Sequence, residues 1–324
     1  MANTTGKKIK DAAIIGGCAS LIYLTIGDIS YRLSLSRGGL NSKLITDMVA
    51  KSAAKKPKNE YKEKLDSMID DGADWFMHQD TEKIIIEKKH RQSLYADLIR
   101  PDKPSNVYII CIHGYTSSPA NMGIYAKKYH ELGYNVLLPS LRGHGDSEQD
   151  FITMGWNDRL DVIEWINYIA ERHPESKIIL HGVSMGAATM MATGEKLPEN
   201  VKAAIEDCGY TSAWDILGIR LTKSIKLPRF PFLYSANIVN LLRENFNLRN
   251  ASSVKQVKKS VTPTLFIHGE ADTFVPYEML DKVYSAAACE KEMLSVPDAP
   301  HARSVCAHPE LYWKAVTGFI NKHI

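Results

Sequence analysis

Three side chains in this sequence, a serine, an aspartate and a histidine, have types and positions suited to nucleophilic catalysis. Ser184 stands in the segment His181–Gly186 (HGVSMG), with a glycine two residues before it and another two residues after it. An apolar run precedes this segment and small helix-forming residues follow it, which predicts a strand, a sharp turn and a helix. The glycines would let the strand and the helix approach closely where a Cβ would clash. The same short pattern also occurs by chance, so an ordinary turn with an incidental serine is the alternative.

A serine hydroxyl becomes a useful nucleophile only when a base removes its proton and a third group orients that base. Asp272 follows the strand expected at 264–268, and His301 follows the strand expected at 293–296. The order Ser184, Asp272, His301 therefore supplies one residue for each task. We predict that His301 is the base and that Asp272 orients it.

Other ionisable residues are rivals for these tasks. Glu270 and Asp298 are alternative acids, and His308 is an alternative base, although the pair His308–Pro309 is typical of a helix start. We expect four further histidines and one cysteine to have structural roles in strand ends, turns and buried positions: His113, His144, His181, His268 and Cys208.

The chain around these residues alternates between short apolar runs and amphipathic segments. This alternation predicts a mostly parallel central sheet flanked by helices. Strands are expected at 84–86, 94–99, 107–112, 136–138, 201–206, 264–268 and 293–296, and helices at 120–132, 156–171, 277–288 and 309–322. Residues 178–196 are expected to hold the strand before the serine turn, whose apolar run is 178–180, and the helix after the turn.

Residues 211–260 interrupt this alternation. They contain Pro228 and Pro231 and no clear strand, so we predict an insertion that lies over the sheet edge as a lid, before the penultimate core strand. The segment carries nine Lys or Arg residues against only Asp215 and Glu244. A solvated basic face is the ordinary explanation, and attraction to anionic lipid or to an acidic substrate is the alternative.

The first 35 residues differ from the rest in composition. Lys7, Lys8 and Lys10 precede an uncharged stretch of sixteen residues, 12–27, which is short of the roughly 20 residues of a bilayer span. We predict that residues 1–35 form a hydrophobic anchor or helix, with membrane association through 12–27 and the C-terminal part outside the cytoplasm. A soluble N-terminal helix on a cytoplasmic protein and a cleaved signal are the alternatives. We predict that residues 36–81 form a helical connector.

The composition is that of a globular protein. The chain has 324 residues, of which 44% are hydrophobic and 24% charged, and a formal net charge of +3. This charge gives no indication of nucleic-acid binding. The five cysteines are odd in number and scattered without zinc-type spacing, so we expect neither a disulfide framework nor a metal site. The oligomeric state does not follow from the sequence.

From about residue 82 to the end, the chain resembles the α/β-hydrolase superfamily, in its group of serine esterases, lipases and aminopeptidase-like enzymes. Five motifs occur in that family's order: 113–115 (HGY), 142–147 (RGHGDS), the serine turn, 269–276 (GEADTFVP) and the late histidine. One departure is Ser140, where relatives commonly have aspartate. The resemblance implies an α/β-hydrolase fold over 82–324, with the lid at about 211–260.

The resemblance also implies a reaction. Ser184 would attack an acyl carbonyl, His301 would take and later return the proton, and Asp272 would hold His301. The backbone N–H groups of Tyr115 and Met185 would bind the oxyanion, with the Tyr115 hydroxyl as an alternative donor. We expect a small-molecule ester or acyl substrate, a carboxylesterase-like activity and no cofactor. A peptidase or amidase, an acyltransferase and a non-catalytic binding module are the alternatives.

Overall fold

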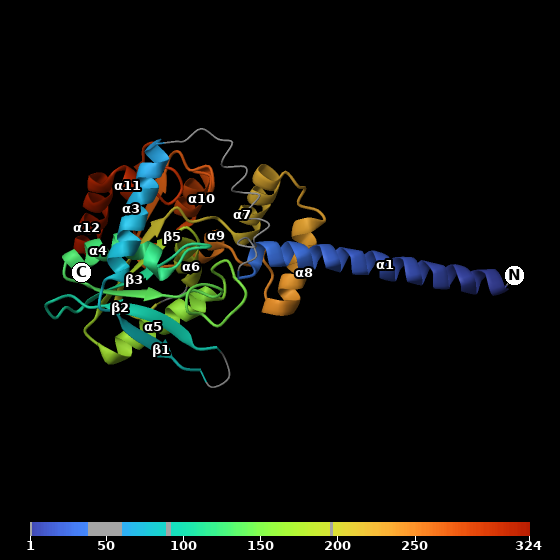
Figure 1. Ribbon diagram of the computed structural model, residues 1–324, viewed down its shortest axis with the longest axis horizontal. Helices are drawn as coiled ribbons and strands as arrows, with labels where there is room; N and C mark the ends of the chain where they lie inside the picture. The colour runs from blue at the N-terminus through green and yellow to red at the C-terminus, as the bar shows by residue number, and fades with distance from the viewer. Residues whose placement is uncertain (1, 38–59, 89–91, 195–196) are drawn as a thin grey trace.

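The computed structural model describes the backbone of residues 2–37, 60–88, 92–194 and 197–324, and the side chains of these ranges from residue 16 onward. Its centre is an eight-stranded sheet with the strand order β1-β2-β4-β3-β5-β6-β7-β8 (Figure 1). The β1–β2 and β2–β4 pairs are antiparallel and all the others are parallel, which confirms the predicted mostly parallel sheet. The strands are β1 (Glu82–Ile86), β2 (Leu94–Ile99), β3 (Val107–Ile112), β4 (Asn135–Pro139), β5 (Lys177–Val183), β6 (Val201–Asp207), β7 (Thr264–Gly269) and β8 (Lys291–Val296).

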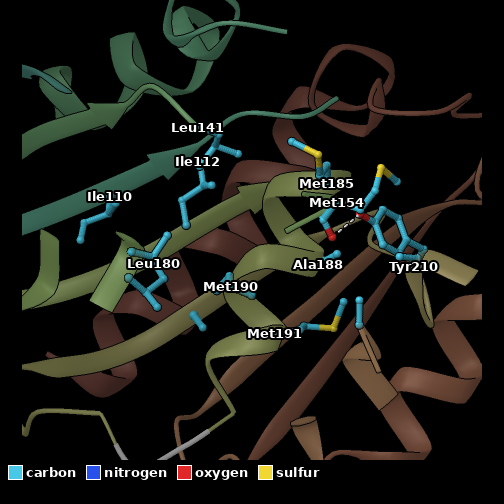
Figure 2. Packing of buried hydrophobic residues seen from close by; sticks show 14 of the residues in the cluster. Ile110, Ile112, Leu141, Met154, Leu180, Met185, Ala188, Met190, Met191 and Tyr210 are labelled. Carbon is cyan, nitrogen blue, oxygen red and sulfur yellow. Dashed lines mark hydrogen bonds between the residues drawn. The ribbon is translucent and has the colours of Figure 1, made fainter. Parts of the chain in front are cut away.

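The central strands are buried on both faces, as continuous apolar runs predict. In β3, Tyr108 and Ile110 enter one hydrophobic core, whereas Ile109 and Cys111 enter the core on the opposite face. This alternation follows from the two-residue repeat of a strand. Figure 2 shows part of the first core, where side chains of β3 and β5 pack beside those of the helix that follows Ser184.

Helices cover both faces of the sheet. One core receives apolar side chains from α5, α6, α9 and α10, and the other from α3, α4, α11 and α12. The helices are α3 (Glu60–Met77), α4 (Gly123–Glu131), α5 (Asp158–Arg172), α6 (Met185–Thr193), α9 (Ser253–Val257), α10 (Glu278–Ala286), α11 (Ser304–Ala307) and α12 (Pro309–His323), with a 3-10 turn η1 (Pro119–Met122) before α4.

Helix α3 falls within the predicted connector 36–81. Its Leu65, Ile69 and Phe76 are buried in the core of one sheet face. It also lies very close to α4, because a Cβ placed on Gly123 would be 2.0 Å from the Gly72 carbonyl oxygen. Residues 60–77 thus contribute to the core, while residues 38–59 of the predicted connector lie outside the described residues.

Between β6 and β7 the chain forms α7 (Ala213–Ile219), the π-helical segment η2 (Arg220–Ile225), α8 (Phe232–Glu244) and α9. No strand forms here, as expected for 211–260. The sequence, with its prolines at 228 and 231, did not predict the individual helices of this segment. Apolar side chains of α7, α8 and α9 enter the first core, and α8 also packs against the N-terminal helix, so their burial depends on segments distant in sequence.

The first helix, α1 (Ala2–Leu35), packs across α8, and its N-terminal part extends away from the rest of the molecule (Figure 1). A Cβ on Gly27 would lie 2.6 Å from the Ser235 carbonyl oxygen, and Asp28 forms an ion pair with Arg243. The helical part of the prediction for 1–35 is thus observed. Among the described residues, no helix has both the length and the apolar character needed to cross a membrane.

Candidate active site

Ser184 lies between the end of β5 and the start of α6, in a backbone conformation that few non-glycine residues adopt. Its φ is 56° and its ψ is −112°. Its N–H donates to the Asp207 carbonyl over 2.8 Å, and its own carbonyl accepts from the Ala188 N–H over 3.0 Å. The neighbouring strand and helix therefore hold the strained turn in place. Such strain is found most often at functional sites.

The two glycines of the turn are required by close backbone contacts. A Cβ on Gly182 would lie 2.4 Å from the Gly186 carbonyl oxygen, and one on Gly186 would lie 2.0 Å from the Ile112 carbonyl oxygen. Helix α6 can therefore start directly over β3 and β5, and its Met185 and Ala188 pack into the core (Figure 2). This is the close approach that the glycine spacing predicts.

The structure brings Ser184, His301 and Asp272 into one hydrogen-bonded chain. Ser184 Oγ lies 2.9 Å from His301 Nε2, and His301 Nδ1 lies 2.6 Å from Asp272 Oδ2. The three residues follow β5, β8 and β7, whose carboxyl ends meet at one edge of the sheet. The rivals are placed elsewhere: Glu270 and Asp298 are exposed and have no hydrogen bond to His301 among the described residues.

Asp272 is buried and fully bonded. Its Oδ1 accepts from the backbone N–H groups of Phe274 and Val275 at 2.8 and 2.9 Å. Burial alone would raise the pKa of this carboxyl group. The hydrogen bonds from His268 and His301 outweigh burial and lower the pKa to about 2. Asp272 is therefore an anion at neutral pH, placed to fix the His301 ring with Nδ1 protonated and Nε2 free to accept a proton.

His268 was expected to be a packed structural residue, and the structure places it directly against Asp272. Its Nε2 lies 3.0 Å from the Val275 carbonyl oxygen and 3.2 Å from Asp272 Oδ2. Glu206 is buried nearby, and burial raises the pKa of its carboxyl group to about 8. The sequence analysis predicted neither the contact of His268 with Asp272 nor the burial of Glu206 nearby. The signal available for His268 was its place at the end of a strand, four residues before the acid.

The loop after β3 runs alongside the serine turn. A Cβ on Gly114 would lie 3.4 Å from Ser184 Cβ, so the next amide, that of Tyr115, is close to the serine. Among the described residues, the backbone N–H groups of Tyr115 and Met185 have no acceptor. The Tyr115 hydroxyl donates to the Ser34 carbonyl over 2.6 Å. This contact to α1 contradicts the alternative in which that hydroxyl, rather than the backbone, faces the reacting oxygen.

Two histidines hold this loop in place. His113 Nε2 accepts from the Leu141 N–H over 3.2 Å, and His144 Nε2 accepts from the Thr116 N–H over 3.0 Å. Burial lowers the pKa of both imidazoles, that of His113 to about 3. Both rings are therefore neutral near pH 7 and can act as acceptors. They have the bracing roles expected of them.

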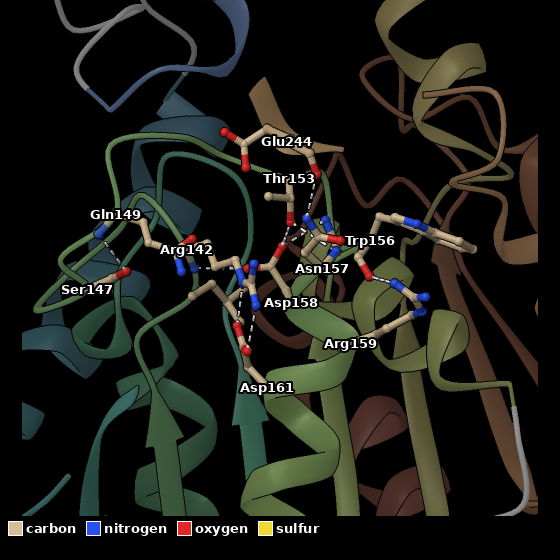
Figure 3. A network of polar contacts seen from close by, with 12 residues as sticks. Arg142, Ser147, Gln149, Thr153, Trp156, Asn157, Asp158, Arg159, Asp161 and Glu244 are labelled. Carbon is tan, nitrogen blue, oxygen red and sulfur yellow. Dashed lines mark hydrogen bonds and ion pairs between the residues drawn. The ribbon is translucent and has the colours of Figure 1, made fainter. Parts of the chain in front are cut away.

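The turn at 142–147 is itself anchored by two carboxylates of α5, the buried Asp158 and the partly buried Asp161 (Figure 3). Asp161 receives two hydrogen bonds from the Arg142 guanidinium, at 2.6 and 2.8 Å. Asp158 accepts from the Arg142 N–H at 2.9 Å and also from the Thr153 hydroxyl and the Gly155 N–H. Through His144, this network fixes the loop that carries Tyr115.

One group of three side chains has the donor types of a metal site. Ligand atoms of Cys208, Asp272 and His301 lie within 4.8 Å of one another. Asp272 and His301 already bond each other, and burial raises the pKa of the Cys208 thiol well above its usual value. A protonated thiol is a poor metal ligand. The arrangement therefore fits a hydrogen-bonded catalytic chain better than a metal centre.

A second buried chain contains His181, beneath the serine turn. Tyr129 Oη lies 2.7 Å from His181 Nδ1, and Tyr312 Oη lies 3.1 Å from His181 Nε2. The Tyr312 hydroxyl also lies 2.9 Å from Asp207 Oδ2, where it donates to the carboxylate. Burial lowers the pKa of His181 to about 3, so its ring is neutral. His181 is therefore a packed structural residue, as expected.

Comparison with known proteins agrees with this fold. Residues 103–219 match the family described as serine aminopeptidase, S33. The chain is 27% identical over 248 residues to the uncharacterized protein YqkD of Bacillus subtilis, covering 76% of this chain and 81% of that one. It is 25% identical over 241 residues to a thermostable monoacylglycerol lipase of a Bacillus species, covering 67% of this chain and 91% of the lipase.

Among solved structures, the Pyrococcus furiosus esterase Pf2001 superposes with a TM-score of 0.61 and 22% identity, over 76% of this chain and 93% of the esterase. Identity at this level shows a shared fold. The mostly parallel sheet, the strained serine turn and these relatives lead to one conclusion: the chain is a hydrolase of the α/β-hydrolase superfamily.

Proposed function

We propose that this protein is a serine hydrolase that cleaves carboxylic esters through an acyl-enzyme. The observation that carries the proposal is the chain of hydrogen bonds from Ser184 through His301 to the ionised Asp272. A nucleophile, a base and an orienting carboxylate in this arrangement suit acyl transfer. The match to the serine aminopeptidase family ends at residue 219, before Asp272 and His301, so their roles rest on the geometry.

In the proposed reaction, Ser184 Oγ attacks the acyl carbonyl carbon while its proton moves to His301 Nε2. Asp272 stabilises the imidazolium that results. The tetrahedral intermediate collapses when His301 returns the proton to the leaving alkoxide, and the acyl group stays on Ser184. A water molecule then attacks the acyl carbonyl carbon while its proton moves to His301. His301 returns this proton to Ser184 Oγ as the bond between Oγ and the acyl carbon breaks, which releases the acid and restores the enzyme.

The oxyanion of each intermediate would be bound by the backbone N–H groups of Tyr115 and Met185. Both groups lie beside Ser184, and among the described residues neither has an acceptor. Donors that are fixed in advance need no reorganisation when the charge develops, and one such donor is typically worth about 10²–10³ in rate. Because the side chains at these positions take no part, the bracing of the loop by His113 and His144 matters more than the identity of Tyr115.

Peptide or amide hydrolysis is the second candidate. It is favoured by the family match, since that family is described as serine aminopeptidase. The names of a curated relative, a monoacylglycerol lipase, and of the solved esterase favour an ester. The same three side chains can serve either reaction. Acyl transfer to an alcohol would use the same acyl-enzyme with another acceptor.

A substrate panel tests the proposal and separates the candidates. The intact protein is assayed with p-nitrophenyl esters of increasing acyl length, aminoacyl p-nitroanilides, and an ester with added alcohol acceptor. We expect turnover of esters and labelling of Ser184 by a fluorophosphonate probe. Wild-type turnover of esters by Ser184→Ala would refute the proposal, and faster cleavage of the anilides would favour the peptidase.

We further propose that residues 211–260 form a lid over this site, on a hydrolase domain that extends from residue 82 to the end. The support is the contact of Arg220, in η2, with Phe274, whose ring stacks on His301. Limited proteolysis with and without a covalent phosphonate inhibitor would test the lid. Protection confined to 211–260 is expected, and unchanged cleavage there would contradict it.

Membrane association through residues 12–27 is a separate proposal. Its support is the uncharged stretch in α1 and the exposed apolar side chains nearby, among them Leu21 (68% exposed) and, on α8, Leu242 (75% exposed). Location of the hydrolase domain outside the cytoplasm stays a prediction, and a soluble cytoplasmic protein is the alternative. Cell fractionation of the full chain tests the membrane association, and full recovery in the soluble fraction would contradict that association.

A further inference from the structure

Phe274 lies directly beside the candidate site, in contact with two of its residues. Its backbone N–H donates to Asp272 Oδ1 over 2.8 Å, and its ring stacks on the His301 imidazole with a centroid distance of 4.8 Å and an interplanar angle of 20°. The residue is half-buried. Any group that contacts this ring is therefore close to the reacting centre without being part of the Ser184–His301–Asp272 chain.

The Arg220 guanidinium is such a group. It belongs to η2, between α7 and α8, and its Cζ lies 3.9 Å from the centroid of the Phe274 ring. Burial lowers the pKa of Arg220, and the negative charge of Asp272 acts in the opposite direction. A guanidinium remains charged under either influence. A positive charge is thus held beside the site by a cation–π contact.

This guanidinium has no anionic partner among the residues that the structure describes. Asp272 does not pair with it, because its two oxygens accept from the Phe274 and Val275 amides and from His301. Two other arginines of the same segment have different surroundings. Arg243 forms an ion pair with Asp28. Arg249 is also stacked, over Trp214 and Tyr234, but it is exposed, whereas Arg220 is half-buried.

A half-buried charge that lacks a partner is costly, since the group gives up water without a replacement. A guanidinium carries five N–H donors in a fixed plane, which match the oxygens of a carboxylate or a phosphate. The stacking on Phe274 holds this plane beside the site, and no hydrogen bond from its N–H donors is formed within the described part of the chain. Such an arrangement suits a ligand that brings its own negative charge.

We infer that Arg220 binds an anionic group of the substrate, a carboxylate or a phosphate carried on the acyl or alcohol part of the ester. This inference rests on the proposed function. The preferred substrates would then be esters that bear a negative charge near the scissile bond. The Arg220 guanidinium would repel the ammonium group of an aminopeptidase substrate, because like charges in a partly desolvated site repel each other. The inference therefore counts against an aminopeptidase.

The test compares three p-nitrophenyl esters of similar length: the neutral butyrate, the hydrogen succinate and the 3-phosphonopropionate. Each is assayed with the full-length wild type, Arg220→Gln, Arg220→Lys and the control Arg249→Gln, which removes a stacked arginine of the same segment. The readout is the ratio of kcat/KM for each anionic ester to kcat/KM for the butyrate. Because this ratio is internal to each variant, a general loss of folded protein does not change it.

We expect Arg220→Gln to lower the ratio at least about tenfold, mainly through KM, as for loss of one charge-assisted hydrogen bond. Arg220→Lys should retain part of it, and Arg249→Gln should leave it unchanged. A decrease for the succinate alone would identify a carboxylate, and one for the phosphonate alone would identify a phosphate. An equal ratio in the wild type and Arg220→Gln would overturn the inference while leaving ester hydrolysis intact. Failure of the wild type on all three esters would overturn both.

Discussion

The sheet carries two hydrogen-bonded chains that are centred on histidines, and they differ in chemistry. In one, His301 lies between a serine hydroxyl and the ionised Asp272, with 20% of its side chain exposed. In the other, His181 lies between the hydroxyls of Tyr129 and Tyr312 and is fully buried. An imidazole can exchange protons with a substrate only where the substrate can reach it and where its charged form has a counter-ion.

His181 has neither property. Burial lowers its pKa to about 3, and its two immediate partners are phenols that remain protonated, because burial also raises their pKa. It therefore holds Tyr129 of α4 and Tyr312 of α12 against β5, directly below the serine turn. His181 supports the serine turn, whereas His301 is placed to exchange a proton with Ser184 in that turn. Four predictions test this difference.

The largest effect is expected for His301→Gln. Loss of the base should lower kcat for ester hydrolysis by about 10⁴–10⁶, as for removal of a member of such a catalytic unit. The matched change His181→Gln, with both phenols still in place, should lower kcat less than about tenfold. Steady-state kinetics of both variants, with circular dichroism to confirm folding, measures the contrast. Similar losses of kcat in the two variants would contradict the assignment.

Asp272→Asn should lower kcat by up to about 10⁴, because an amide can hold His301 in the wrong tautomer and cannot stabilise the imidazolium. On the other chain, Asp207→Asn preserves shape next to Tyr312 and should have a much smaller effect on kcat. The rate of labelling by a fluorophosphonate should fall in parallel with kcat for Asp272→Asn. A slow variant with an unchanged labelling rate would argue that Asp272 acts only on a later step.

The third prediction concerns the dependence of stability on pH. His181 has a folded-state pKa of about 3, whereas in the unfolded chain it has the ordinary value of 6.5. Between these values the unfolded state binds more protons, so stability is lost as pH falls through this range. At pH 5 this loss is about 2 kcal/mol relative to pH 7.5.

His181→Gln removes that loss. Its destabilisation relative to the wild type should therefore be smaller at pH 5 than at pH 7.5, by about 2 kcal/mol. Asp207, whose pKa burial raises to about 6, has the opposite pH dependence but is present in both proteins, so the difference isolates His181. Urea unfolding at the two pH values measures it. An equal destabilisation at both would show that His181 titrates normally.

The smallest effect is expected for Tyr312→Phe. It removes the hydroxyl that donates to Asp207 and contacts His181, and should lower the free energy of unfolding by about 1–2 kcal/mol. Activity at 25 °C should change little. Tyr134→Phe is a control, since that residue is only partly buried. A large fall in kcat for Tyr312→Phe, without loss of stability, would make the His181 chain part of the catalytic machinery.

Local patterns explain which parts were predictable from the sequence. The serine turn depends on two glycines and an apolar strand that are adjacent in the chain, and its strained geometry follows from them. The strands from β1 to β8 lie at or close to their expected positions. The inner strands, such as β3 and β7, are apolar runs that are buried on both faces and are therefore easy to predict. Asp272 and His301 were found because each follows a predicted strand.

The unpredicted features depend on residues far apart in sequence. The contact of Arg220 with Phe274 and the chain from Tyr129 to Asp207 join segments that only the folded sheet brings together. The sequence pattern did not predict α8, because part of its apolar surface packs against α1, about 200 residues earlier in the chain. Glu206 has no local signal at all: its raised pKa is a consequence of burial.

The attachment of α1 has a practical consequence for work with this protein. Ser34, near the end of that helix, accepts a hydrogen bond from Tyr115, and Arg37 donates to carbonyls of Gly145 and Ser147. A shortened chain that starts after residue 37 would be a natural choice for production, yet it would lose both contacts and uncover α8. Its measured rates would understate the native enzyme, because the N-terminal helix supports the loop that contains Tyr115.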